Sequence, residues 1–276
     1  MRVLCSGASG FIGSHLTARL EQLKHTVVPI SRSFLSQPKD LQEFIRLQEP
    51  DYIFHLAAAG NHSNQKDEQQ IFEANVVGTW NMLMASKDVP YKLFVYFSTS
   101  SVDLPYETFY SATKASCERI IKAFVNEYEK PIVIVRPFSV YGPGEADFRF
   151  IPTVCRALIT GEKMPLDPDP VHDWIYIDDV IEAILLIIER REHIGSIVEI
   201  GTEKQTKNIE IAVLLTIIAN KELQYVFERN MRVYDSSSWK ADISELVLHK
   251  WEPKYTLEEG LRKTYEWYTK ERFNNK

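Results

Sequence analysis

The sequence predicts an α/β fold, a doubly wound parallel sheet followed by a smaller C-terminal α/β cap. The first 135 residues alternate short apolar runs with helical patterns, as in βαβ units. A glycine-rich turn stands directly after the first apolar run. After Arg136-Pro137 the pattern changes, and Pro and Gly cluster in loops. At 276 residues the chain can hold one large domain with a modest cap.

The elements of the first half follow from these patterns in order. Short apolar runs bounded by turn signals predict the strands, and a 3.6-residue apolar period predicts the helices. The expected strands are Val3–Ser6, Thr26–Ile30, Tyr52–His55, Leu93–Ser98 and Ile132–Val135. The expected helices are Ile12–Gln22, Leu41–Leu47, Ile71–Ser86 and Tyr110–Tyr128.

The second half is expected to cross between two lobes. A strand at Trp174–Ile177, a helix at Asp179–Glu189 and a strand at Ile197–Ile200 should return to the parallel sheet. The remainder, ending in the amphipathic helix Leu257–Tyr268, predicts the cap. The two expected domains are therefore 1–137 plus 174–201, and 138–173 plus 202–276.

Composition excludes several classes of function. The net charge is −6 without a basic block, so nucleic acid is not expected as a partner. The longest apolar stretches, such as Ile184–Ile188, are too short to span a bilayer. Three scattered cysteines, Cys5, Cys117 and Cys155, and a start without signal-peptide character predict a cytoplasmic protein. The seven histidines form no metal-ligand spacing, so no metal is expected.

The glycine-rich turn has the context of a dinucleotide-binding fingerprint. Gly7, Gly10 and Gly13 follow the first strand and open the first helix, as a Rossmann-type domain requires. The first glycines permit a tight turn and close approach to a pyrophosphate, and the third lets the helix pack on the strand. The cofactor-binding residues expected here are Gly7, Ser9, Gly10, Phe11, Ile12 and Gly13.

The end of the second strand predicts which dinucleotide binds. An NAD site usually places a carboxylate there for the ribose 2′-hydroxyl, but Thr26–Ile30 runs into Ser31-Arg32-Ser33. A guanidinium suits a 2′-phosphate, so Ser31 and Arg32 predict a preference for NADP(H) over NAD(H). The alternative is that Arg32 is a solvated loop residue.

Tyr110 and Lys114 are candidate catalytic residues. Four residues apart on a helix, they share one face, and an ammonium near a phenol favours the phenolate. Of the 13 tyrosines, Tyr110 alone has a lysine at this spacing. The alternative is a chance pair on a solvated helix face.

The chain resembles the extended short-chain dehydrogenase/reductases that act on nucleotide sugars, namely epimerases, dehydratases and keto-sugar reductases. Besides the glycine turn and the Tyr110–Lys114 pair, the shared motifs run nearly from end to end. They are His55-Leu-Ala-Ala58, Asn75-Val-Val-Gly-Thr79, Ser98-Thr-Ser-Ser-Val102, Arg136-Pro-Phe-Ser-Val-Tyr-Gly-Pro143, Asp173-Trp-Ile-Tyr-Ile-Asp-Asp-Val180 and Trp251-Glu-Pro with Leu257-Glu-Glu-Gly-Leu261.

The resemblance implies roles for individual residues. Thr99 would hydrogen-bond the reacting oxygen, Tyr110 would exchange the proton, and Lys114 would hold the nicotinamide ribose. Arg232 would bind the substrate diphosphate, unless it is a surface arginine. The helix with Tyr110 and Lys114 would pair with its twin in a homodimer. The further residues expected to line the cofactor are Leu56, Ala57, Ala58 and Phe138.

Departures from the family pattern narrow the chemistry. Ser100 and Ser101 stand where dehydratases carry an Asp-Glu pair, so elimination of water is not expected. Ser139 stands where the family often has Asn, and His172 where it often has Arg, which weakens one phosphate contact or makes it pH-dependent. Ser139 and His172 are therefore candidate substrate-binding residues, and could equally be packing residues.

Three functions remain open from the sequence. The first is NADPH-dependent reduction of a nucleotide-activated keto-sugar, at C4 of a 4-keto-6-deoxy hexose, with Tyr110 as proton donor. The second is a redox-neutral nucleotide-sugar epimerase, which needs the same Thr99, Tyr110 and Lys114. The third is a non-catalytic dinucleotide-sensing regulator, which the presence of both Tyr110 and Lys114 disfavours.

Overall fold

The structure divides into two compact units. The computed structural model describes residues 1–61, 67–191, 193–229 and 238–272. Unit 1 comprises Met1–Asp103, Glu107–Pro137 and Ile184–Glu199. Unit 2 comprises Leu104–Tyr106, Phe138–Ala183 and Ile200–Lys276.

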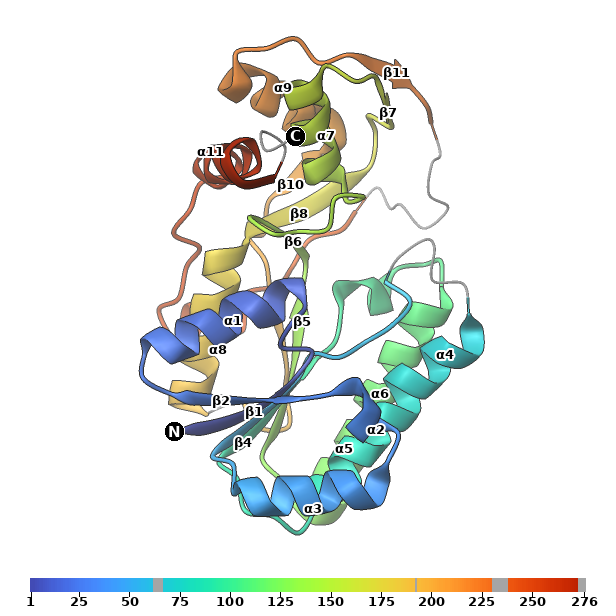
Figure 1. The fold of residues 1–276 in the computed structure, drawn as a ribbon, viewed down its shortest axis with the longest axis vertical. Coiled ribbons are helices and arrows are strands. Elements are labelled where there is room, and N and C mark those ends of the chain that lie inside the picture. The colour runs from blue at the N-terminus through green and yellow to red at the C-terminus, as the bar shows by residue number, and fades with distance from the viewer. Residues whose placement is uncertain (62–66, 192, 230–237, 273–276) are drawn as a thin grey trace. The chain divides into compact units, whose positions relative to one another are not determined.

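Unit 1 is built on a six-stranded sheet with the order β2-β1-β3-β4-β5-β9 (Figure 1). The pairs from β2 through β5 are parallel. Every residue of β3 and β4 is buried, as expected for parallel strands covered on both faces. The strands are β1 (Arg2–Ser6), β2 (Thr26–Ile30), β3 (Tyr52–His55), β4 (Leu93–Phe97), β5 (Ile132–Pro137) and β9 (Ile197–Ile200).

Helices cover both faces of this sheet. On one face, Leu41, Met82 and Ile121 from three helices join Leu4 and Phe94 of the strands in one apolar core. Figure 1 shows α3, α5 and α6 along that face and α1 along the other. The helical segments are α1 (Phe11–Gln22), α2 (Arg32–Leu35), α3 (Pro38–Gln48), α4 (Glu68–Phe72), α5 (Gly78–Ser86) and α6 (Phe109–Tyr128), with a π-helical turn at Glu73–Val77 and a 3₁₀ turn at Ser100–Asp103.

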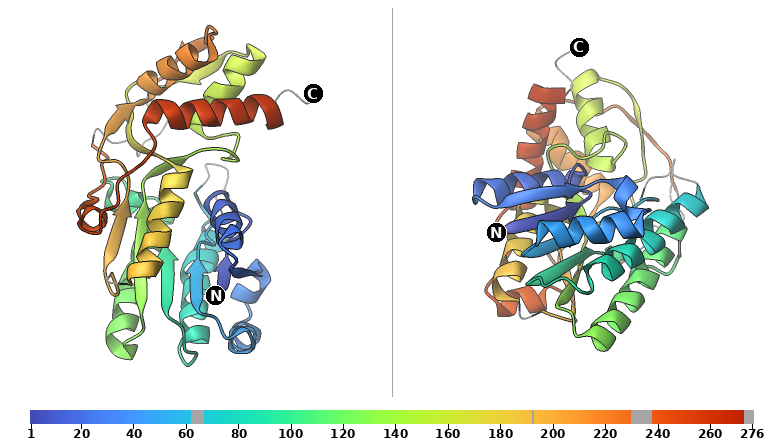
Figure 2. Two further views of the ribbon diagram at one scale, coloured as in Figure 1. Left: turned by 90° about the vertical axis from the view of Figure 1, so that its left-hand side faces the viewer. Right: turned by 60° about the horizontal axis from the view of Figure 1, so that its bottom comes forward.

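Unit 2 contains two small sheets and several helices. One sheet has the order β10-β8-β6, and the other pairs β11 with β7 in parallel. Helix α9 packs against both α7 and α11 in this unit (Figure 2). Its elements are β6 (Ser139–Tyr141), α7 (Phe150–Thr160), β7 (Met164–Leu166), β8 (Val171–Tyr176), β10 (Gln205–Lys207), α9 (Asn208–Ala219), β11 (Tyr225–Phe227), α10 (Ser244–Leu248) and α11 (Leu257–Trp267), followed by a π-helical turn at Tyr268–Arg272. Helix α8 (Ile177–Arg190) contributes its residues up to Ala183 to unit 2 and those from Ile184 on to unit 1.

The predicted fold class is confirmed, but one strand belongs to a different sheet. Trp174 lies in β8, which pairs in parallel with β6 and antiparallel with β10 and takes no part in the six-stranded sheet. The expectation that this strand returns to the main sheet is therefore wrong. Five of the six residues of β8 are buried. A continuous apolar run predicts a buried strand but does not indicate which sheet the strand joins. The strand Ile197–Ile200 does join the main sheet, beside β5.

The long helix expected at Ile71–Ser86 is also interrupted. The structure has α4, the π-helical turn and α5 in succession. A π turn inserts one extra residue into a helix, and such turns are frequent at functional sites. The apolar periodicity of the sequence does not reveal the π turn, because α4 and α5 on either side of it each keep the ordinary helical spacing.

Candidate active site

The glycine turn between β1 and α1 has the geometry that a dinucleotide cradle needs. Gly7 has φ +76°, and a Cβ there would lie 2.7 Å from the Ala57 nitrogen. A Cβ on Gly13 would lie 2.1 Å from the Gly7 oxygen, so the start of α1 packs directly on the turn. Gly10 caps α1 without a side-chain hydrogen bond, which leaves N–H groups at the helix start for a ligand anion. Ser9 is exposed, and Phe11 and Ile12 are half-buried in the same turn.

The end of β2 carries hydroxyls and one cation. Ser31 precedes α2, and its Oγ lies 2.7 Å from the Oγ of Ser33. Arg32 is exposed at the first position of that helix. Within the described ranges no carboxylate forms an ion pair with Arg32. Its guanidinium is thus available at the strand end that faces a bound ribose in this fold class.

The segment after β3 is held on both sides. The Leu56 nitrogen donates to the Ser6 oxygen at 3.0 Å, and Leu56, Ala57 and Ala58 are each half-buried. Asn75 of the π turn then fixes Ala59: its Oδ1 accepts from the Ala59 nitrogen at 2.8 Å, and its Nδ2 donates to the Ala59 oxygen at 2.9 Å. The strip expected to line the cofactor is therefore anchored at each end.

Asn75 also connects this strip with the helix of Tyr110 and Lys114. Its Nδ2 donates to the Thr113 Oγ1 at 2.9 Å, and the Thr113 hydroxyl donates to the Tyr110 backbone oxygen at 2.9 Å. The Cys117 thiol, one turn further along α6, donates to the Asn75 oxygen at 3.2 Å. One asparagine thus bridges the cofactor strip and the candidate catalytic helix.

Helix α6 presents Tyr110 in its first turn and Lys114 one turn later. The helix begins at Phe109 because Thr108 and Ser111 form a capping box. Tyr110 is half-buried, whereas Lys114 is only 2% exposed. The Lys114 Nζ lies 4.2 Å from the centroid of the Tyr96 ring on β4. Burial lowers the pKa of Lys114 to about 8, opposed by Cys117 and Glu118.

Thr99 lies in the segment that follows β4. Its Oγ1 is 3.1 Å from the Ser101 Oγ and accepts from the Ser101 nitrogen at 3.2 Å. Thr99 is half-buried and Ser100 is buried, at the start of the 3₁₀ turn. The nearest acid in sequence, Asp103, is bound to Arg136. The segment therefore offers hydroxyl groups, with its carboxylate already paired.

His55, the last residue of β3, connects the sheet with α5 next to the site. The Ser6 Oγ lies 2.6 Å from its Nδ1, and the Thr79 Oγ1 lies 3.1 Å from its Nε2. Complete burial, together with the charge of Lys114, lowers the pKa of His55 to about 3. The imidazole is therefore neutral, and it acts as a structural link between β1, β3 and α5.

The candidate substrate residues belong to unit 2. The Ser139 Oγ lies 3.1 Å from the His172 Nδ1, and His172 is 6% exposed between the rings of Trp174 and Trp239, each centroid 4.9 Å away. This arrangement gives His172 a packing role, and its contact with a substrate phosphate stays a prediction. Phe138 is half-buried and its nitrogen donates to the Ile200 oxygen at 2.9 Å. Arg232 lies outside the described residues.

Several contributing residues are absent from the sequence-based expectations. Asn75 lies in a quoted motif, but its bridging contacts join segments far apart in the chain. Tyr96 is hidden in an apolar strand, where an aromatic residue reads as core. Glu118 had a signal, since it continues the four-residue spacing of Tyr110 and Lys114 along α6.

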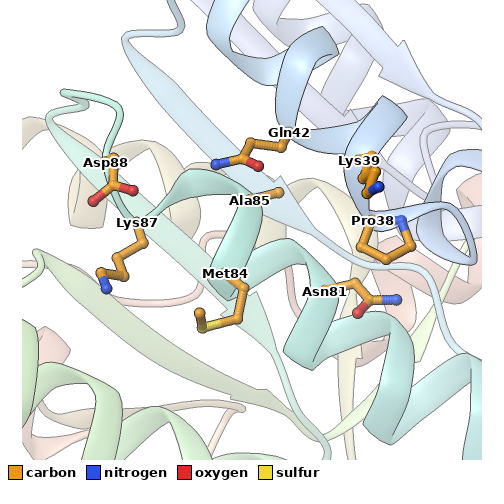
Figure 3. A pocket seen from close by; sticks show the side chains of 8 residues that line it. All are labelled: Pro38, Lys39, Gln42, Asn81, Met84, Ala85, Lys87 and Asp88. Carbon is orange, nitrogen blue, oxygen red and sulfur yellow. The ribbon is translucent and has the colours of Figure 1, made fainter.

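A small pocket among the described residues lies elsewhere in unit 1. Figure 3 shows it between α3 and α5. Its volume of about 190 Å³ is below that of ordinary ligand pockets. It contains none of the candidate site residues, so we assign it no role. Its lining residues are Pro38, Lys39, Gln42, Asn81, Met84, Ala85, Lys87 and Asp88.

The described residues contain neither a cluster of metal ligands nor a membrane-spanning helix. No group of three or more His, Cys, Asp or Glu side chains there could hold a metal ion. Among the same residues, every helix is either too short or too polar to cross a bilayer.

Comparison with known proteins identifies the family. The sequence model of the NAD dependent epimerase/dehydratase family matches residues 3–201, which span the glycine turn, Thr99 and the Tyr110–Lys114 helix. The chain belongs to this family. The expected resemblance to extended short-chain dehydrogenase/reductases, an enzyme family, is thereby confirmed.

Individual members show how far the similarity extends. The chain is 27% identical to the Arabidopsis thaliana trifunctional UDP-glucose 4,6-dehydratase/UDP-4-keto-6-deoxy-D-glucose 3,5-epimerase/UDP-4-keto-L-rhamnose-reductase RHM3, over 97% of this chain and 47% of that protein. It thus spans about half the length of this relative. Among solved structures, the Bacillus cereus UDP-glucuronic acid 4-epimerase with UDP-glucuronic acid and NAD has a TM-score of 0.86 and 27% identity, covering 97% of this chain and 98% of that one. The Thermotoga maritima UDP-glucose 4-epimerase with UDP-glucose shares the fold, with a TM-score of 0.89 at 24% identity over 97% and 98% of the two chains.

Proposed function

We propose that this family member reduces a nucleotide-activated keto-sugar with NADPH, at C4 of a 4-keto-6-deoxy hexose. The observation that carries the proposal is the exposed guanidinium of Arg32 at the end of β2, in a stretch without a carboxylate. A 2′-phosphate there gains a cationic partner, whereas an NAD ribose lacks its usual acidic partner. NADPH is the cofactor of net reductions, which favours a reductase over a redox-neutral cycle.

The residues around the glycine turn fit a nicotinamide dinucleotide. Added Cβ atoms at Gly7 and Gly13 would collide with backbone, so the turn keeps a close-packed cradle beside α1. Gly7, Gly10 and Gly13 would hold the pyrophosphate, Ser31 and Arg32 the adenosine ribose phosphate, and Leu56–Ala58 and Phe138 would line the cofactor. When bound, NADPH supplies the hydride.

Three side chains then complete the reduction. The Tyr110 hydroxyl gives its proton to the carbonyl oxygen of the sugar as the carbonyl carbon accepts the hydride, which yields the alcohol. The Thr99 hydroxyl hydrogen-bonds the same oxygen and orients it. The Lys114 ammonium, buried beside Tyr96, stabilises the negative charge left on Tyr110 and holds the nicotinamide ribose.

The absence of an acid pair beside Thr99 opposes a dehydratase. Loss of water from the sugar needs an acid and a base at the adjacent carbons. Ser100 and Ser101 occupy those positions, and Asp103 is engaged by Arg136. A single proton transfer by Tyr110 is what this site can provide.

A nucleotide-sugar epimerase is the second candidate. The observation that favours it is the likeness to the Bacillus cereus 4-epimerase solved with UDP-glucuronic acid and NAD, at 27% identity over nearly all of both chains. In an epimerase the hydride returns to the substrate, so Thr99, Tyr110 and Lys114 have the same duties. Only the stoichiometry separates the two activities.

Three further properties accompany the proposal. Ser139, His172 and Arg232 would contact the substrate, in a lobe formed by 138–173 plus 202–276. The protein would be a cytoplasmic homodimer that pairs through α6. Light scattering of the purified chain measures the oligomeric state, and a monomeric mass would contradict the dimer.

The test combines the chain with NADPH and UDP-4-keto-6-deoxy-D-glucose or its dTDP counterpart, and follows NADPH absorbance together with the sugar product. A reductase consumes one NADPH per product. Interconversion of sugars without loss of NADPH would establish the epimerase instead.

Tyr110→Phe is the decisive variant in this assay, with Tyr128→Phe on the same helix as its matched control. Tyr128 is 42% exposed, so loss of its hydroxyl should leave turnover unchanged. Undiminished turnover in Tyr110→Phe would refute the proton-transfer role. NADPH binding without turnover of any keto-sugar nucleotide would favour the third reading, a dinucleotide-sensing regulator.

A further inference from the structure

A buried ion pair lies next to Thr99 in unit 1. The Arg136 Nε and Nη2 donate to the two carboxylate oxygens of Glu118, at 2.9 and 2.6 Å. The exposed fractions of the two side chains are 13% and 6%. Such a bidentate pair has a fixed geometry, unlike an exposed ion pair between flexible side chains.

This ion pair binds both ends of the segment that contains Thr99, at Ser98 and at Asp103. The Ser98 hydroxyl donates to the Glu118 Oε1 at 2.5 Å, directly before Thr99. The Arg136 Nη1 contacts the Asp103 Oδ2 at 2.5 Å, at the last residue of the 3₁₀ turn. The five-residue stretch from Thr99 to Asp103 is therefore tied down on either side by one cluster.

The surrounding carboxylates keep the Arg136 guanidinium charged. Burial by itself would lower the pKa of Arg136, but its hydrogen bonds with Glu118 and the charges of Glu118, Asp103 and Glu199 raise that pKa overall. Glu199 contributes from β9, 3.6 Å from the Arg136 Nη1. The guanidinium thus stays charged throughout the ordinary pH range.

Glu118 belongs to the same helix face as the candidate catalytic pair. Tyr110, Lys114 and Glu118 follow one another at four-residue spacing on α6, so each is rotated by only about 40° from the last. The carboxylate that holds Ser98 therefore stands on the rigid element that carries Tyr110 and Lys114. Displacement of Thr99 relative to that helix would require breaking this link.

We propose that Glu118 and Arg136 are positioning residues that fix the Thr99 hydroxyl relative to Tyr110 and Lys114. The inference rests on the proposed function, because it relies on the role of Thr99 in the reaction. It goes beyond that function by assigning an indirect role to a buried ion pair that has no part in the proposed reaction. The alternative is an ion pair that serves folding stability alone.

Ser98→Ala is the variant that separates these readings. It removes the link between the Thr99 segment and Glu118 while leaving the Glu118–Arg136 pair intact. Ser86→Ala is its matched control, since Ser86 is also buried in unit 1 and its hydroxyl donates to the Met82 oxygen at 2.8 Å, on α5. Ser98→Thr, which keeps a hydroxyl, should restore function.

Turnover provides the first readout. With the keto-sugar nucleotides named above, Ser98→Ala should lower kcat about tenfold to hundredfold, with the Kd for NADPH unchanged. Ser86→Ala should retain the kcat of the unmodified chain. In a Thr99→Ala background, Ser98→Ala should have no further effect, because it acts through Thr99. Additive losses in the double variant would overturn the positioning role.

Hydrogen–deuterium exchange provides a readout that needs no substrate. Amides of residues 98–103 should exchange faster in Ser98→Ala and in Asp103→Ala, but not in Ser86→Ala. Asp103 has a 63% exposed side chain, so its replacement removes little buried packing. Unchanged exchange in both variants would overturn the proposal whatever the activity.

The two readouts together distinguish this proposal from the proposed function. If Thr99→Ala turns over substrate like the unmodified chain, the role of Thr99 fails, and exchange alone decides whether the cluster holds the segment. If Thr99→Ala is impaired while Ser98→Ala is fully active despite faster exchange, the positioning role is wrong and the proposed function stands.

Discussion

The ammonium of Lys114 lies 4.2 Å from the centroid of the Tyr96 ring, where the lysine side chain is almost completely buried. An aromatic face stabilises a cation without neutralising it, unlike a carboxylate. Lys114 can therefore stay charged in a dry environment and still act on its surroundings.

Lys114 should make stability depend on alkaline pH. Its pKa is about 8 in the folded chain against 10.5 unperturbed, because burial disfavours the charged form. Between these values the unfolded chain binds a proton that the folded chain does not, so the contribution of Lys114 to the free energy of unfolding should rise with pH. Urea denaturation across this window should show a less positive slope of the free energy of unfolding against pH for Lys114→Met than for the unmodified chain.

The matched control for this slope is Lys87→Met, since Lys87 also lies over a tyrosine ring, that of Tyr128 at 4.4 Å. The control should keep the slope of the unmodified chain. An equal slope in Lys114→Met and in the unmodified chain would show that Lys114 is not the group responsible.

Tyr96 should be replaceable by Phe but not by Leu. The Tyr96 hydroxyl is buried beside Cys117 and Thr79, and it forms no close hydrogen bond with a described residue. Tyr96→Phe should therefore be neutral or slightly stabilising, because the ring that faces Lys114 remains. Tyr96→Leu removes the cation–π contact and should cost about 2 kcal/mol or more in urea denaturation. Equal losses for Phe and Leu would argue against the contact.

Arg32 should determine the choice between the two dinucleotides. Arg32→Ala should weaken NADPH binding about tenfold, a modest loss because solvent screens charges at this exposed site. NADH binding should be unchanged, because NADH has no 2′-phosphate for Arg32 to contact. The Kd of each cofactor from fluorescence titration measures the effect, which should shrink as salt is added. Arg46→Ala, at an exposed arginine paired with Glu43 on α3, serves as the control. Tighter binding of NADH than NADPH by the unmodified chain would contradict the NADPH preference itself.

Gly13 should not accept even one methyl group. Its Cβ would lie 2.1 Å from the Gly7 backbone oxygen, so Gly13→Ala must push α1 away from the turn. We expect a loss of about 1–3 kcal/mol in stability and abolished dinucleotide binding. Gly78→Ala is the matched control, since Gly78 is also buried in a helix but meets its nearest atom only at 3.6 Å. It should be neutral or stabilising.

The sequence predicted the positions of individual helices and strands better than the contacts between them. The strands Thr26–Ile30, Tyr52–His55 and Ile197–Ile200 have their predicted bounds, because each is a short apolar run between turn signals. Trp174 was placed in the wrong sheet, since a buried strand does not encode its neighbours. The same limit applies to Glu118 and Arg136, whose pairing joins residues 18 positions apart. Spacing along a helix predicts which residues share a face, but not which residue of another element contacts that face.

The Asn75 side chain satisfies the backbone of Ala59 just beyond the carboxyl end of β3. One amide group gives Ala59 both the donor and the acceptor that a neighbouring strand would have provided, and its second N–H goes to Thr113. Asp lacks the donors, and Gln is one methylene longer. The Asn75 side chain thus replaces a neighbouring strand for the extended chain beyond β3. Position 75 should therefore tolerate few substitutions.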